Sequence, residues 1–117
     1  MAGTKLNPLF RGDSREYTLA FTDSEGNVVN IGDWTVYFTL KKYAWKSDEE
    51  ADVKKDITEH TNPSQGQTKI VLISSDTEGL RTGIYSYDIQ IKKADETIIT
   101  ILSGTLEIKA DITRRTD

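Results

Sequence analysis

Hydrophobic and polar residues alternate with a period of two along most of the chain, as they do in strands with one buried face. The alternation is clearest in DWTVYFTLKK at 33–42, in GIYSYDIQIKK at 83–93 and in EYTLAF at 16–21. These three segments are therefore predicted to be half-buried strands.

Other segments lack strict alternation. KIVLI at 69–73 is a short, branched apolar run, which predicts a strand covered on both faces. TIITILSGTLEIKADI at 97–112 is long for one strand, and Ser103-Gly104 in its middle predicts a bulge or bend. The segment 43–55 carries an acidic cluster and is interpreted as an exposed loop with room for one helical turn.

Turn-forming residues separate these runs at the spacing of a sandwich or barrel. The segment 74–88 resembles the corner between strands E and F of immunoglobulin-like sandwiches, where an early tyrosine hydroxyl bonds back to the corner backbone. Tyr85 takes the place of that tyrosine. Tyr87 takes the place of the second disulfide cysteine of an antibody domain, and we expect it to pack on Trp34 of the opposite strand.

We therefore predict an all-β, immunoglobulin-like β-sandwich of about seven to eight strands. The 117 residues fit a single domain, residues 1–117, with flexible tails at about 1–7 and 113–117 that become ordered on docking. The expected core residues are Leu19, Phe21, Trp34, Val36, Phe38, Leu40, Ile70, Leu72, Tyr85, Tyr87, Ile89, Ile91, Leu106 and Ile108.

Composition excludes several classes of function. The chain has no cysteine, so no disulfide framework or thiolate chemistry is available, which favours a reducing compartment or a particle assembled inside a cell. The formal net charge is −4 without a basic stripe, so nucleic-acid binding has little support. The N-terminal residues lack the apolar region of a signal peptide, and no apolar run is long enough for a membrane helix.

Candidate catalytic and metal-ligating residues are sparse. His60 is the only histidine, and its position beside a polar turn indicates a solvated turn residue. DSEGN at 23–27 departs from the calcium-loop pattern and is interpreted as a hairpin turn. SDEEAD at 47–52 is interpreted as a solubilising loop. We expect no enzymatic activity, no metal and no cofactor.

Two aromatic residues are candidates for contact with a ligand. Tyr43 and Trp45 flank Ala44 in the apparent loop, and exposed tyrosine and tryptophan serve both protein and carbohydrate interfaces. The alternative is that Trp45 caps an open end of the core. Sequence leaves both interpretations open.

Several segments, taken in order, resemble one group of phage proteins. They are an Arg-Gly-Asp opening to a strand at Arg11–Asp13, Gly-Ile-Tyr-Ser-Tyr-Asp at 83–88, Gly-Thr-Leu-Glu-Ile at 104–108 and Asp-Ile-Thr-Arg at 111–114. The chain resembles, over roughly residues 6–115, the small immunoglobulin-like domain of structural proteins from tailed phages and prophages. It is similar to the N-terminal domain of baseplate upper proteins.

The tetrapeptide Arg11-Gly12-Asp13-Ser14 is also an integrin-binding sequence. Here it precedes a strand, so Gly12 permits a sharp bend while Asp13 or Ser14 caps exposed amides. The resemblance implies the same structural role. We therefore interpret Arg11, Gly12 and Asp13 as a structural turn, and binding to integrin is not expected.

The resemblance implies a structural virion component of a tail, baseplate or neck region. Such a protein assembles inside the host bacterial cytoplasm, in multiple copies, through contacts with itself and with other virion proteins. The expected contact residues are Tyr43, Trp45 and the tails at 1–7 and 113–117. The alternatives are a carbohydrate-binding β-sandwich module and a capsid decoration protein.

Overall fold

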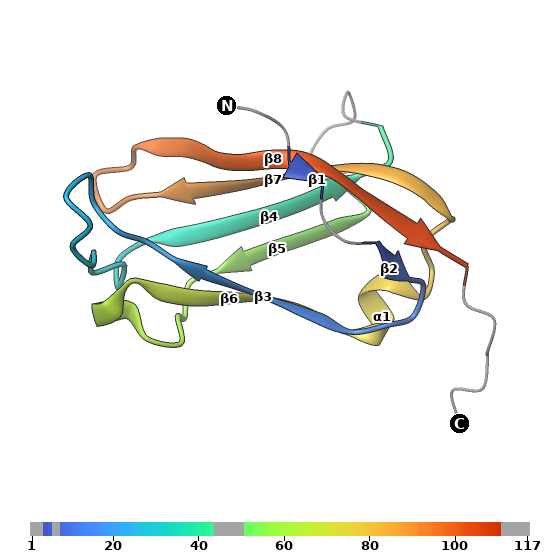
Figure 1. Ribbon diagram of the computed structural model, residues 1–117, viewed down its shortest axis with the longest axis horizontal. Helices are drawn as coiled ribbons and strands as arrows, with labels where there is room; N and C mark the ends of the chain where they lie inside the picture. Colours follow the sequence, from blue (N-terminus) through green and yellow to red (C-terminus); the bar gives the residue numbers. More distant parts are fainter. Residues whose placement is uncertain (1–3, 6–7, 44–50, 111–117) are drawn as a thin grey trace.

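Two β-sheets face each other in the computed structural model, which describes residues 4–5, 8–43 and 51–110 (Figure 1). The larger sheet has the strand order β1-β8-β7-β4-β5, with β2 pairing on β8, and the smaller sheet pairs β3 with β6. The strands are β1 (Thr4–Lys5), β2 (Leu9–Phe10), β3 (Arg15–Ala20), β4 (Thr35–Lys41), β5 (Val53–Ile57), β6 (Gln67–Leu72), β7 (Gly83–Lys92) and β8 (Ile98–Lys109).

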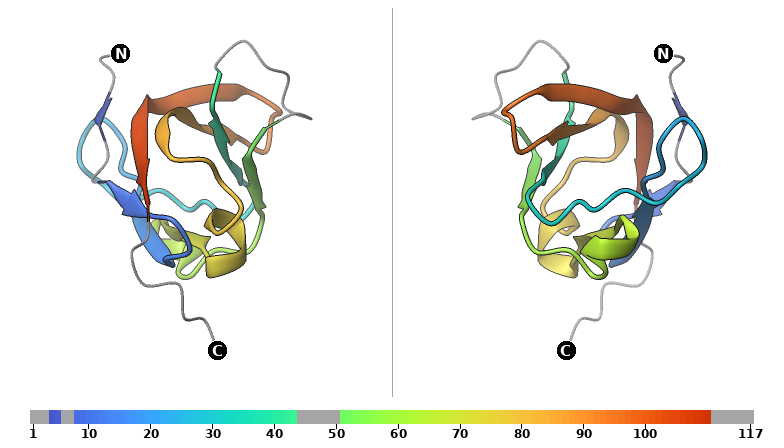
Figure 2. Two further views of the ribbon diagram at one scale, coloured as in Figure 1. Left: turned by 90° about the vertical axis from the view of Figure 1, so that its right-hand side faces the viewer. Right: turned by 90° about the vertical axis from the view of Figure 1, so that its left-hand side faces the viewer.

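This arrangement confirms the predicted immunoglobulin-like β-sandwich. The central strands β4, β7 and β8 pair antiparallel, whereas the short N-terminal strands β1 and β2 both lie parallel to β8. Among the described residues, short helical segments outside the sheets are a 3-10 turn, η2 (Pro63–Gln65), and α1 (Ser74–Thr77). The views along the sandwich show both sheets enclosing the core (Figure 2).

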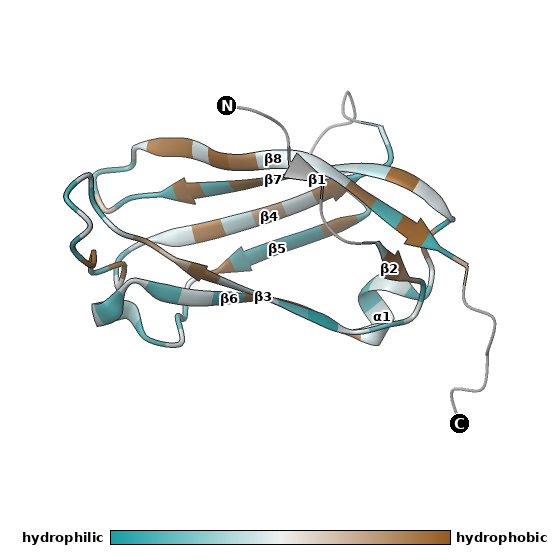
Figure 3. Cartoon of the chain, viewed as in Figure 1, coloured by the Kyte–Doolittle hydropathy of each residue, from teal (hydrophilic) through white to brown (hydrophobic). Residues whose placement is uncertain are grey.

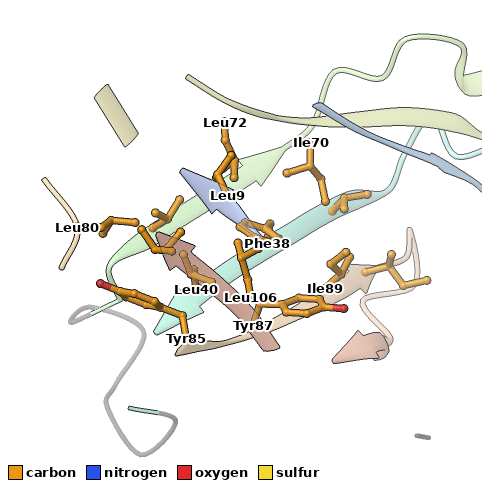
Figure 4. Packing of buried hydrophobic residues seen from close by; sticks show 14 residues of the cluster. Leu9, Phe38, Leu40, Ile70, Leu72, Leu80, Tyr85, Tyr87, Ile89 and Leu106 are labelled. Carbon is orange, nitrogen blue, oxygen red and sulfur yellow. The ribbon is translucent and has the colours of Figure 1, made fainter. Parts of the chain in front are cut away.

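The core lies between the sheets where the alternation places it (Figures 3 and 4). In β4, Val36, Phe38 and Leu40 are completely buried and their neighbours are half-buried. Eleven of the fourteen expected core residues are buried, and Leu19, Phe21 and Trp34 are partly buried against them. Four buried apolar residues fall outside the predicted core, namely Leu9, Ile31, Val53 and Leu80.

Aromatic packing across the core differs from the expectation. Tyr87 stacks on Phe38 with a centroid distance of 6.2 Å, and Tyr17 lies on Phe38 at 6.5 Å. Trp34 instead meets Phe21 edge to face at 5.4 Å. The predicted pairing of Tyr87 with Trp34 is therefore wrong, because Trp34 precedes β4 and packs near the other end of the sandwich.

Three further expectations need correction. The run 69–73 is covered on one face only, since Val71 and Ile73 are exposed. The β-bulge in β8 falls at Ile101, where the register to β7 shifts, and not at Ser103-Gly104, which pair regularly. Part of the expected loop at 43–55 is strand, because β5 begins at Val53.

The carboxylate of Asp76 joins α1 to the larger sheet. It accepts a hydrogen bond from the Ile73 backbone N–H at 2.8 Å and lies 2.7 Å from the ammonium of Lys55 in β5. Burial opposes ionisation of this carboxyl group, but Lys55 and the Ile73 amide together outweigh burial and lower its pKa below 3.8.

Because the pKa of Asp76 is lower in the folded state, the contribution of its carboxylate to the stability of the fold depends on pH. The ionised carboxylate stabilises the fold at neutral pH, and the stabilisation is lost as the pH falls below the unfolded-state value of 3.8 and through the lower folded-state pKa. Asp76→Asn is therefore expected to be less stable than the parent at neutral pH and equally stable in strong acid. Urea unfolding across this range measures the difference. Asp56→Asn, on the same strand as Lys55, is the control, and an identical pH profile for both variants would contradict the assignment.

Candidate functional site

The Arg-Gly-Asp sequence forms the tight turn between β2 and β3. The Asp13 backbone N–H donates to the Phe10 carbonyl at 3.0 Å, and Gly12 has a φ of +87° at the third position of the turn. A positive φ at this position is typical of a type II turn and favours glycine. The Arg11 N–H also donates to the carbonyl of Lys109 in β8, at 2.8 Å. The turn is thus tied directly to the last strand of the sandwich.

A hydroxyl from α1 fixes the inner side of this turn. Thr77 is completely buried, and its Oγ1 accepts a hydrogen bond from the Gly12 N–H at 2.9 Å and donates to the Asp13 carbonyl at 3.0 Å. We expected Asp13 or Ser14 to cap the exposed amides, but the cap at Gly12 comes from Thr77, 65 residues further along the chain. Arg11, Gly12 and Asp13 thus lie in a turn that hydrogen bonds to Thr77 and Lys109 hold in place.

Replacing Thr77 with valine keeps the side-chain shape and removes the hydroxyl. We expect the free energy of unfolding to fall by about 1–3 kcal/mol, because the Gly12 amide loses its partner in a partly buried position. Urea denaturation measures this change. Asp13→Ala truncates an exposed side chain of the same turn and should change stability by less than about 0.5 kcal/mol. An equal loss in both variants would argue against the role given to the Thr77 hydroxyl.

Tyr85 forms the corner that the sequence predicts. Its hydroxyl donates to the Arg81 carbonyl at 2.7 Å, and its side chain is almost completely buried. Burial and, to a lesser extent, the negative charge of Asp52 raise the pKa of Tyr85 above 10.0. The hydroxyl therefore remains protonated and able to donate at neutral pH.

A cleft of about 600 Å³ opens beside this tyrosine corner. Its lining residues are Lys42, Tyr43, Asp52, Gly79, Leu80, Arg81, Thr82 and Tyr85. Tyr43 is half-exposed there, whereas Trp45 and the tail residues 1–3, 6–7 and 113–117 lie outside the described residues. The turn at Gly12, α1 and this cleft all lie at one end of the sandwich, which we call the corner end (Figures 1 and 2).

The charged groups of the cleft are held in place by short contacts. The Lys42 ammonium lies 5.1 Å from the centroid of the Tyr85 ring, and the Asp52 carboxylate accepts a hydrogen bond from the Lys42 backbone N–H at 2.7 Å. The cleft thus combines lysine and arginine, a carboxylate, hydroxyls and an exposed tyrosine ring. These groups suit a hydroxylated or anionic ligand, or a polar segment of a partner protein.

His60 does not behave as a solvated turn residue. It is half-buried, with Nδ1 2.8 Å from the hydroxyl of Thr68 and Nε2 2.8 Å from the carbonyl of Trp34. The carbonyl can only accept, so Nε2 carries a proton and donates to it. His60 joins β6 to the start of β4, and both ring nitrogens already have partners within the fold.

The described residues contain no group of three or more histidine, aspartate or glutamate side chains placed to hold a metal ion. Within the part of the chain that the structure describes, no helix is long and apolar enough to cross a membrane.

Comparisons with known proteins show similarity at the level of the fold. No protein-family model matches the sequence, and no curated protein matches it. The solved structure of CopC from Methylosinus trichosporium OB3b aligns with a TM-score of 0.46 and 13% identity, covering 92% of this chain and 89% of that one. The FN1–FN3 domains of chicken CNTN1 align with a TM-score of 0.43 and 14% identity, covering 92% of this chain and 35% of that one.

Proposed function

We propose that this protein is a structural component of a tailed phage or prophage particle, built into a tail, baseplate or neck region in multiple copies. It acts through protein–protein contacts and carries out no catalysis. Particle assembly takes place in the cytoplasm of the host bacterium. Its partners are other virion proteins and copies of itself, and neither nucleic acid, membrane nor integrin is among them.

One observation carries this proposal: three sequence segments on which the phage resemblance depends meet at one place. Ile108, in the closing Gly-x-Leu-x-Ile motif, pairs with Leu9 on one side and with Gly83 on the other. Leu9 leads into the Arg-Gly-Asp turn, and Gly83 opens the Gly-x-Tyr-x-Tyr-Asp strand. The motifs thus lie together in one packed unit, and this juxtaposition supports the proposal.

The rigidity of this unit supports a role in assembly. At the corner end, the Thr77 hydroxyl holds the turn at Gly12 and the Tyr85 hydroxyl holds the loop at Arg81. The surface between these two segments is therefore preorganised for a partner. A preorganised surface loses little conformational entropy on binding, and repeated copies in a symmetric particle add avidity.

Mass spectrometry of gradient-purified particles from a producing strain tests the proposal. We expect to recover this chain in a copy number that matches the symmetry of a tail or baseplate ring. Analysis of separated tails and capsids distinguishes a tail component from a capsid decoration protein. Absence of the chain from intact particles would overturn the proposal.

The second candidate function is carbohydrate binding, which the half-exposed Tyr43 in the cleft of the corner end favours. Glycan-array binding that disappears in Tyr43→Ala or Trp45→Ala would support it. Tyr37→Ala, on the outer face of β4, is the matched control. Absence of glycan binding by the parent protein would remove this candidate.

A further inference from the structure

The first half of β8 forms an edge of the larger sheet. Residues 98–102 pair with β7 on one side, interrupted by the bulge at Ile101. On the other side, β1 begins its pairing only at Gly104 and β2 only at Ile108. No described residue pairs with the outer side of β8 before Gly104. This stretch, residues 98–103, is named the open edge below.

The open edge carries no charge, and its first three residues, 98–100, are exposed while residues 101–103 are half-buried. The run TIITILSGTL at 97–106 contains no charged residue and is rich in branched side chains, and Figure 3 shows this part of β8 as largely hydrophobic. Ile98 is 58% exposed and Ile99 is 40% exposed. Long, uncharged, apolar edge strands are templates for pairing with another chain.

The other sheet edges are protected by charge. The outer strand β5 has the sequence VKKDI, and the smaller sheet carries Arg15 and Glu16 on β3 and Lys69 on β6. Charged side chains, lysine above all, are the usual means by which an edge avoids pairing with a second molecule. The open edge lacks this protection, which sets it apart from the edges at β3, β5 and β6.

The backbone of the open edge presents unpaired groups. The Lys93 N–H donates to the Thr97 carbonyl at 2.9 Å, and bonded pairs alternate along an antiparallel ladder. In the observed register of β7 and β8, this alternation directs the N–H and C=O of Ile99 toward β7. The same groups of Ile98 and Thr100 therefore point away from β7, toward the outer side of the sheet.

We propose that the open edge pairs with the open edge of a second copy of this chain, antiparallel and about a two-fold axis. A two-fold contact places the segment against itself, and a segment without charge meets itself without repulsion in any register. A charged partner would leave its charges unmatched there. The inference rests on the proposed function, because it assigns a surface and a partner to the assembly in multiple copies.

Sedimentation velocity of the purified full-length chain over a range of concentrations tests this contact. We expect a reversible dimer for the parent, and at least about a tenfold weaker dimer for Ile98→Lys, because each copy then carries an unmatched lysine charge on the edge that has to pair. Ile84→Lys is the matched control. Ile84 is 61% exposed, but it lies on β7, which is paired on both sides. Equal weakening by both substitutions would overturn the proposal.

A second variant tests the backbone contact independently of charge. Thr100→Pro removes an N–H that points away from β7, so we expect the monomer to keep its circular dichroism spectrum and the dimer to be lost. A parent chain that remains monomeric at all concentrations would also overturn the inference, and would fit coverage of the edge by the segment that precedes β1. That result, with the chain still recovered from purified particles, would leave the proposed function standing. A chain that dimerises but is absent from particles would overturn the proposed function and leave the edge-to-edge contact standing.

Discussion

Replacing Phe38 with alanine is expected to lower the free energy of unfolding by about 3–5 kcal/mol. Phe38 is completely buried in the core, and the rings of Tyr17 and Tyr87 both stack on it. Truncation removes the apolar transfer energy of the ring and leaves a cavity that two large neighbours cannot both fill. Urea denaturation followed by tyrosine and tryptophan fluorescence measures the loss.

Phe10→Ala is the matched control for this substitution. Phe10 is 46% exposed and contacts the ammonium of Lys109, 6.0 Å from the ring centroid. The same truncation there should therefore cost about 1 kcal/mol or less. A loss at Phe38 as small as that at Phe10 would mean that the three-ring stack is not the centre of the core.

The second large effect is expected for Gly66→Ala. Gly66 ends the turn η2 with a φ of +72°, and a Cβ at this position would lie 2.6 Å from the Phe21 carbonyl oxygen and 2.8 Å from that of Val29. The left-handed backbone costs a non-glycine residue about 1–2 kcal/mol. The clash with two backbone oxygens adds about 1–3 kcal/mol, because neither oxygen can rotate away as a side chain would.

Gly26 separates these two contributions. It has a φ of +84°, and no atom lies within 4 Å of a Cβ built there. Gly26→Ala should therefore show only the backbone cost, and its thermal midpoint should lie between those of the parent and Gly66→Ala. If the two alanine variants unfold at the same temperature, the close approach of the Phe21 and Val29 carbonyl oxygens adds nothing to the cost of Gly66→Ala.

The strands could be predicted from the sequence because the two-residue period follows directly from backbone geometry. Val36, Phe38 and Leu40 are buried for that reason. Their partners across the core depend on register, which the sequence pattern does not contain. In the observed register Leu40 lies opposite Tyr87, and Trp34 falls beyond the end of β4, where the Lys93 ammonium lies 5.6 Å from its ring centroid.

The strand β5 escaped prediction because an edge strand needs few apolar residues. Only Val53 is fully buried in VKKDI, and its two lysines and aspartate suggest a loop when they are considered without the sheet. The charges that conceal the strand in the sequence are those that protect its edge in the structure.

The candidate site was predicted in part. Local chemistry was enough to place Tyr85 at the corner, because its bond to the Arg81 carbonyl spans only four residues. The contacts of Thr77 with the Arg-Gly-Asp turn and of His60 with Trp34 join segments far apart in the chain. Such contacts depend on the packing of the two sheets, and no spacing within the sequence encodes them.

The parallel pairing of β1 and β2 with β8 has a mechanical consequence. In this parallel arrangement, a force that pulls Thr4 backward along β1 and Lys109 forward along β8 slides these strands lengthwise past one another. Sliding strains the hydrogen bonds of both short strands, and the bond from Arg11 to Lys109, at the same time. An antiparallel hairpin pulled at its ends would release its bonds one after another. The sandwich is therefore expected to resist tension along the line between its termini better than its modest size suggests.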